Sequence, residues 1–139
     1  MVRRGRFKLT LSSDIRFLDV AKAAFENFAN THGLMDEDTL YWCWVGLQEA
    51  LVNAIRHGNG ENPELPVVFD VSLEKSKLVM SITDQGSGVD LADVPDPTSP
   101  ENLLRSSGRG FLFIRKAMDN VQGKRVDHGF TLIMEKQIG

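Results

Sequence analysis

The sequence predicts an α/β protein of the α+β kind, a two-layer sandwich in which helices cover one face of a mostly antiparallel, mixed sheet. Three observations lead to this fold class. One short strand pattern precedes two long helical patterns, a pair of alternating runs then predicts a hairpin, and a further helix and strand pair follow. The length of 139 residues suits a single domain, 1–139, with one core.

The first half of the chain is expected to hold one strand and two helices. Alternating apolar residues predict a strand over 7–12, preceded by a flexible arm at 1–6. Apolar side chains then recur every three or four residues as far as Gly33, which can end a helix. Acidic residues at 36–38 suit the start of a second helix, and the glycine-rich stretch 58–60 terminates its pattern.

The second half is expected to hold a hairpin, a loop, a helix and a last strand pair. Residues 65–74 and 77–84 alternate on either side of a Lys-Ser turn, which predicts antiparallel strands. The polar segment around 89–107 is too rich in helix breakers for a helix, and a loop this long is usually functional. Helical spacing returns over 111–120, and 121–136 predicts two strands around a turn.

The composition excludes several classes of protein. A net charge of −3 gives no general attraction to nucleic acid or to anionic lipid. No run approaches the roughly 18 apolar residues that a membrane span needs. The single cysteine, Cys43, cannot form an internal disulfide and falls within a helical apolar pattern. We therefore expect Cys43 to be a small core residue and the protein to be cytoplasmic.

A carboxylate and a carboxamide lie close together on the second predicted helix. Asn53 is about 40° round the helix from Glu49. Taken alone, the pair is compatible with the polar outer face of an amphipathic helix. The rest of that side is unusually apolar, however, with Trp42, Val45, Gly46 and Val52. A helix that is apolar on both sides, with two polar groups set into one of them, is typical of the wall of a cleft.

A D-x-G-x-G pattern follows the second strand of the hairpin. Asp84 shares its side of the strand with apolar residues, so its carboxylate is expected on the buried face. A buried Asp needs a partner, and an amino group of a ligand would serve. Gly86 and Gly88 permit a tight turn and a close approach of the backbone to a ligand. An ordinary turn after a strand would show the same pattern.

Two glycines precede the third predicted helix. Gly108 and Gly110 lead into a helix N-terminus, whose free N–H groups and positive dipole suit phosphates. Arg105 and Arg109 could add charge-assisted contacts. A helix cap after a loop is the alternative, and the absence of a Gly-Lys-Ser/Thr motif excludes a P-loop.

Taken in order, these motifs resemble the ATP-binding fold of gyrase-type ATPases and histidine kinases. The match is closest to the anti-sigma regulatory factors, the small serine-protein kinases of bacterial partner-switching systems. It extends from about residue 7 to residue 136 and is carried by "EALVNAIRHGN", "DQGSGVD", "DPTSPENLLRSSGRGFLFIRKAMD" and "GFTLIMEK". The resemblance implies a single histidine-kinase-like ATPase domain of the Bergerat type, with residues 89–107 as the ATP lid.

The resemblance also assigns roles to individual residues. It implies that Glu49 is the general base, and that Asn53 is a ligand of the Mg²⁺ bound to the ATP phosphates. It implies that Asp84 binds the adenine amine, and that Gly86 and Gly88 pass close to the base and the ribose.

The remaining implied contacts lie in the lid and on the last strand. Gly108, Arg109 and Gly110 would belong to the phosphate-binding lid and helix start, with Arg105 as a further phosphate contact. Family members often carry a Gly-Thr pair on a late strand, but here Phe130 separates Gly129 from the threonine. Thr131 is kept as an adenine contact, although a shift of one residue turns a side chain to the other face of a strand.

The expected function is therefore that of an ATP- and Mg²⁺-dependent serine-protein kinase that is also an anti-sigma factor. It would phosphorylate a STAS-type antagonist, sequester a sigma factor or similar regulator, and form a homodimer, without binding nucleic acid or membrane. A nucleotide-binding interaction module without kinase activity is the first alternative. A histidine-kinase catalytic domain or a gyrase-like ATPase is less favoured, since each would need a further domain.

Overall fold

A computed structural model describes residues 4–86 and 106–138, and the side chains of residues 4–86 and 112–138. Its elements, in chain order, are β1 (Arg4–Ser12), η1 (Ile15–Phe17), α1 (Leu18–His32), α2 (Glu37–Val52), η2 (Asn53–Gly58), β2 (Pro66–Glu74), β3 (Lys77–Asp84), α3 (Ser106–Ala117), β4 (Asn120–Val126) and β5 (Gly129–Gln137). This order confirms the predicted succession of strand, two helices, strand pair, helix and strand pair.

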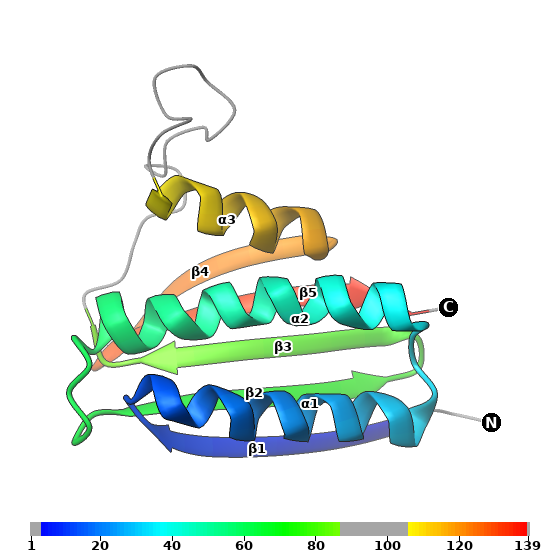
Figure 1. The fold of residues 1–139 in the computed structure, drawn as a ribbon, viewed down its shortest axis with the longest axis horizontal. Helices are drawn as coiled ribbons and strands as arrows, with labels where there is room; N and C mark the ends of the chain where they lie inside the picture. The colour runs from blue at the N-terminus through cyan, green and yellow to red at the C-terminus, as the bar shows by residue number, and fades with distance from the viewer. Residues whose placement is uncertain (1–3, 87–105, 139) are drawn as a thin grey trace.

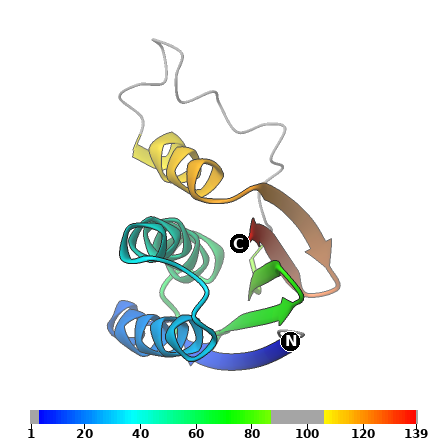
Figure 2. The ribbon, with the colours of Figure 1, turned by 90° about the vertical axis from the view of Figure 1, so that its right-hand side faces the viewer.

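The described strands form one sheet in the order β1-β2-β3-β5-β4. All the pairings between these strands are antiparallel, so the predicted mixed sheet is wrong in that detail. Strands β2 and β3, and likewise β4 and β5, are neighbours in sequence and pair as hairpins. The two hairpins are joined where β5 pairs with β3 in the middle of the sheet. The three α-helices lie side by side on one face of the sheet (Figures 1 and 2), which confirms the α+β two-layer fold class.

Strand β1 begins earlier than the sequence predicts. Its register with β2 runs from Arg4 opposite Glu74 to Ser12 opposite Pro66. Arg6 also forms a bidentate ion pair with Asp70, with one N–O distance of 2.6 Å. Residues 4–6 therefore belong to the sheet rather than to a flexible arm, because the ladder of backbone hydrogen bonds continues past the apolar alternation that marked the strand.

Polar groups at the helix ends satisfy the free backbone groups there. The Asp36 side chain accepts a hydrogen bond from the Thr39 N–H at 2.7 Å, which caps the start of α2. Gly33 ends α1 in the left-handed conformation, with φ of 58°, as the sequence predicts. None of the described helices combines the length and the apolar character that a membrane-spanning helix requires.

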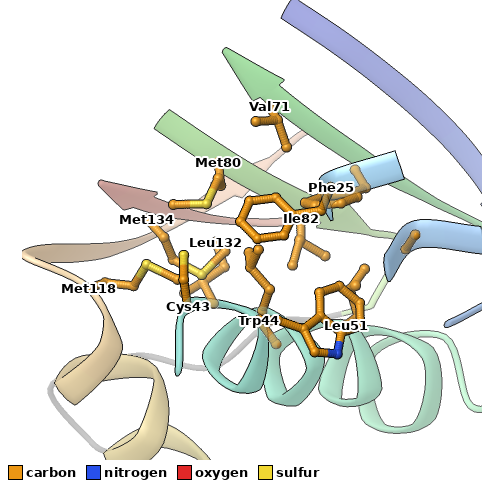
Figure 3. Packing of buried hydrophobic residues seen from close by; sticks show 14 of the residues in the cluster. Phe25, Cys43, Trp44, Leu51, Val71, Met80, Ile82, Met118, Leu132 and Met134 are labelled. Atoms are coloured by element: carbon orange, nitrogen blue, oxygen red, sulfur yellow. The ribbon is translucent and has the colours of Figure 1, made fainter. Parts of the chain in front are cut away.

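The core fills the space between the helices and the sheet, as Figure 3 shows. Phe25 of α1 stacks on Trp44 of α2, with ring centroids 6.3 Å apart. Sheet residues beneath them include Val71, Met80, Ile82, Leu132 and Met134. Cys43 is buried among these residues, and burial raises the pKa of its thiol to about 12. Its predicted role as a core residue is confirmed.

Helix α3 lies close against α2 at Gly46. A Cβ atom at position 46 would lie only 2.8 Å from the Cβ of Ala117, so a side chain there would push the two helices apart. Glu49 and Asn53 are three and seven residues further along the same stripe of the helix. The side of α2 that carries Glu49 and Asn53 is therefore the side that contacts α3, at Gly46.

Helix α3 also begins earlier than predicted, at Ser106 rather than near residue 111. The two glycines that were expected to precede the helix lie inside it, because packing on α2 can override the low helix propensity of glycine. Because α3 begins at Ser106, the N–H groups of its first three residues, 106–108, have no carbonyl partner within the helix.

Candidate functional site

The polar pair on α2 lies where the α-helix changes its geometry. Glu49 is in the last turn of α2, and Asn53 is the first residue of the π-helical segment η2. Both side chains are half-buried rather than fully exposed. A π-helical turn within an α-helix is rare and occurs mostly at functional sites, where it changes the direction of side chains. The geometry therefore favours the cleft-wall interpretation of this pair over a solvated outer face.

Asp84 lies at the end of β3, on the face of the sheet that the helices cover. It alternates with the buried residues Leu78, Met80 and Ile82, and only 7% of its surface is exposed. Burial raises the pKa of this carboxyl, and the hydrogen bond from the Gly86 N–H to Oδ1, at 2.7 Å, acts in the opposite direction. Among the described residues Oδ2 has no hydrogen-bond partner.

Three glycines let the backbone come together around Asp84. A Cβ atom on Gly58 would strike the Asp84 carboxylate, and a Cβ on Gly86 would strike the Gly58 carbonyl oxygen. A Cβ on Gly129 would strike the Asp84 carbonyl oxygen. The end of η2 therefore lies directly against Asp84, which brings the segment that begins with Asn53 next to the end of β3.

A shallow hollow of about 480 Å³ adjoins this turn. It is lined by Gln85 and Gly86 on one side and by residues 125–129 of the β4-β5 hairpin on the other. Gly86 is the one predicted site residue among its described lining residues.

Sequence reasoning missed Asn59. It is buried, with 4% of its surface exposed, and its side chain joins Ser13 and the consecutive residues 65–66 to Gln85, the residue after Asp84. In the sequence it stands between two glycines and has the features of an ordinary helix-ending residue. No pattern along the chain reveals its partners, because they lie up to 46 residues away.

The structure does not bring Thr131 to Asp84. Thr131 lies on the other face of the sheet, where its hydroxyl oxygen is 2.8 Å from that of Thr83. Directly opposite Asp84 in the β3-β5 pair is Phe130, whose side chain faces the core. An adenine contact from Thr131 has no support in this geometry, because successive side chains of a strand point to opposite faces.

The other predicted contacts fall partly or wholly outside the described residues. Gly88 and Arg105 lie outside them. Gly108, Arg109 and Gly110 are in the first turns of α3, where the backbone is described and the side chains are not.

The sequence matches the family described as the histidine kinase-like ATPase domain over residues 11–136. The anti-sigma F factor of Bacillus subtilis (strain 168) is 39% identical over 133 residues, covering 92% of this chain and 87% of that protein. The anti-sigma F factor of Geobacillus sp. (strain WCH70) is 34% identical, with the same coverage of the two chains.

Solved structures share the fold at low sequence identity. The RsbU and RsbW domains of a Mycobacterium tuberculosis protein superpose with a TM-score of 0.70 at 14% identity, over 96% of this chain and 32% of theirs. The histidine kinase domain of a blue-light activated kinase from Erythrobacter litoralis gives a TM-score of 0.58 at 16% identity, over 89% of this chain and 60% of that one. With the match to the family and the identity to curated relatives, these findings show that the chain belongs to the histidine kinase-like ATPase domain family, among its anti-sigma factors.

Proposed function

We propose that the protein is an ATP-dependent serine-protein kinase and anti-sigma factor of a partner-switching system. The observation that carries this proposal is the contact between the end of η2 and Asp84, which supports a common site for Asp84 and Asn53, the first residue of η2. Membership of an ATPase domain family and two relatives named anti-sigma F factor support it.

Asp84 is suited to recognise the base of the nucleotide. Its carboxylate is buried and Oδ1 is engaged by Gly86, so Oδ2 would accept a hydrogen bond from the adenine amine. A hydrogen bond from a ligand would also compensate for the loss of hydration of this carboxylate. The phosphates would lie toward the N-terminus of α3, where the N–H groups of residues 106–108 and the helix dipole favour an anion.

Asn53 is suited to hold the magnesium ion that accompanies ATP. Its carboxamide oxygen is a hard ligand, and Mg²⁺ usually takes one or two protein ligands and completes its shell with water and substrate phosphates. No group of three or more His, Cys, Asp and Glu that could hold a metal occurs within residues 4–86 and 106–138. The proposed magnesium site would therefore use Asn53 as its protein ligand, and the ATP phosphates and water would supply the other ligands. When bound, the ion would neutralise charge on the phosphates.

Glu49 is suited to be the general base, one turn before Asn53 on the same side of the helix. Its carboxylate would accept the proton of a serine hydroxyl on the partner protein. The serine oxygen then forms a bond to the γ-phosphorus as the bond from that phosphorus to the β-γ bridging oxygen breaks, and ADP leaves. The products are a phosphoserine, ADP and a proton carried first by Glu49.

The partners follow from the relatives rather than from the site. The relatives' name supports a sigma factor as the sequestered protein, and a STAS-type antagonist would supply the serine. We propose a homodimer in the cytoplasm as the working form.

Glu49→Gln tests the kinase proposal. The variant keeps the size and polarity of the side chain but cannot accept a proton, so transfer of labelled phosphate from ATP to a STAS protein should fall at least about a hundredfold. ATP affinity, measured by titration calorimetry, should stay close to that of the wild type.

Gln48→Ala is the matched control, because Gln48 is the exposed neighbour of Glu49 and should tolerate the change. Normal transfer by Glu49→Gln would show that the base is wrongly assigned. A wild-type protein that binds ATP but phosphorylates no serine partner would instead be a nucleotide-binding interaction module.

A further inference from the structure

We infer that Asn59 is a positioning residue, which sets the place of Asp84 relative to the helix that carries Asn53. The inference rests on the proposed function, because it assigns Asn59 a role in nucleotide binding. It does not make Asn59 a contact of the nucleotide.

The Asn59 side chain uses both ends of its amide. Nδ2 donates to the Ser13 hydroxyl oxygen at 2.8 Å, to the Pro66 carbonyl oxygen at 3.0 Å and to the Leu65 carbonyl oxygen at 3.3 Å. Oδ1 accepts the backbone N–H of Gln85 at 2.7 Å. The orientation of the amide is fixed by this chemistry, since carbonyl oxygens need a donor and the Gln85 N–H needs an acceptor.

The two ends serve different parts of the molecule. The Nδ2 end holds together the chain after β1 and the start of β2, where the Ser13 hydroxyl also donates to the Leu65 carbonyl oxygen at 2.6 Å. The Oδ1 end reaches the residue that immediately follows Asp84. Stability should therefore depend on both ends, and the position of Asp84 on the Oδ1 end alone.

The turn after β3 is held by hydrogen bonds at two consecutive backbone amides, those of Gln85 and Gly86. Asn59 holds the Gln85 N–H, and the Asp84 carboxylate holds the Gly86 N–H. Within the described part of the chain, the Asn59–Gln85 bond is the only hydrogen bond between residues 53–60 and residues 84–86. Gly58 also comes close to Asp84 and Gly86, and this close approach limits how near the two segments can come.

The test separates the two ends of the amide with three variants. Asn59→Asp keeps an oxygen for the Gln85 N–H and removes the Nδ2 donor. Ser13→Ala removes a partner of the Nδ2 end, together with the Ser13 hydrogen bond to the Leu65 carbonyl oxygen, and leaves the Oδ1 end intact. Asn59→Leu has a similar volume and removes both ends. For each variant the Tm and the ATP dissociation constant would be measured, the latter well below that variant's Tm.

All three variants should have a lower Tm than the wild type. Only Asn59→Leu should also lose ATP affinity, by about tenfold, which is the effect expected from one hydrogen bond that orients a binding group. Asn59→Asp and Ser13→Ala should bind ATP within about twofold of the wild type. Equal ATP affinity in Asn59→Leu and Asn59→Asp would overturn the inference, since a purely structural residue would behave in that way.

A second measurement does not depend on any variant folding. In the wild type, exchange of the Gln85 amide proton with solvent, followed by NMR, should be slow although the Gln85 side chain is exposed. Exchange at the rate of an unprotected amide would overturn the inference.

Failure of the inference can be told apart from failure of the proposed function. If the wild type does not bind ATP, both fail. If the wild type binds ATP and Asp84→Asn weakens that binding, while Asn59→Leu binds ATP like the wild type, only the role of Asn59 fails.

Discussion

Asp84 is a carboxyl group buried at the end of β3, and its burial opposes ionisation in the folded protein. Its carboxylate lies against Gly58 and accepts a single described hydrogen bond, from the Gly86 N–H. Burial raises its pKa above the ordinary value of 3.8, which means that the folded protein holds the proton more tightly than the unfolded chain does. Ionised Asp84 therefore destabilises the ligand-free protein, and a nucleotide that donates a hydrogen bond to it would offset this cost.

Asp84→Asn should separate these two effects. The amide oxygen can still accept from Gly86, so the ligand-free variant should have a higher Tm than the wild type at neutral pH. Wild-type stability should fall as the pH rises from the ordinary pKa of Asp through the raised pKa of Asp84. The difference in Tm between the variant and the wild type should therefore shrink when the pH is lowered below that range. ATP binding should weaken by roughly tenfold to a hundredfold, because a charged acceptor is lost.

The measurements are thermal unfolding between acid and neutral pH and ATP titration at neutral pH. A variant that is less stable than the wild type at neutral pH would contradict the assigned cost of burial. Unchanged ATP affinity would count against the contact with adenine.

The crossing of α2 and α3 is the feature that matters most among the elements. Glycine is a poor helix former, yet Gly46 is in the middle of α2. The structure explains this position by the close approach of Ala117, since the two backbones come nearer than a pair of alanines would allow. The same crossing sets where the N-terminal turn of α3 lies relative to Glu49 and Asn53.

Gly46→Ala should destabilise the protein even though alanine is the better helix former. Overpacking of this kind costs about 1–3 kcal/mol in the free energy of unfolding. In an Ala117→Gly background the clash is absent, and the same change should stabilise by up to about 1 kcal/mol. Urea unfolding of the wild type, the two single variants and the double variant measures this coupling. Additive effects would show that the two positions do not determine the crossing.

At the scale of the whole molecule, the proposed site joins segments far apart in the chain. Asn53 follows α2, Asp84 ends β3, and the N-terminus of α3 comes after the residues that the structure does not describe. A nucleotide that contacts all three would bind the folded protein and not the unfolded chain. Its binding energy should therefore appear as stability of the entire domain.

ATP with Mg²⁺ should raise the Tm in a concentration-dependent way. At about a hundred times the dissociation constant, the stabilisation is about 2.7 kcal/mol, which corresponds to a rise of roughly 10 °C for a domain of this size. Removing Mg²⁺ with a chelator should reduce the rise, and Asn53→Ala should make the rise less dependent on Mg²⁺. A rise that is the same with and without Mg²⁺ would contradict the role of Asn53.

Much of the fold was predictable because it depends on local periodicity. The alternation of β2 and β3, the three- and four-residue spacing of α1, and its end at Gly33 are all properties of neighbouring residues. The starts of β1 and α3 were predicted too late because pairing with β2 and packing on α2 extend both elements beyond the residues that carry the pattern.

For the site, the sequence by itself determined which residue types are available: Glu49 and Asn53 on one side of a helix, and Asp84 on the inward face of a strand. Only the tertiary structure decided that Gly58 lies against Asp84, that Thr131 is on the other face of the sheet, and that Asn59 holds the turn at Gln85. The physical reason is the separation in sequence between the residues that interact. Side-chain direction follows from the local period of a helix or strand, whereas contacts between distant segments depend on how the whole core packs.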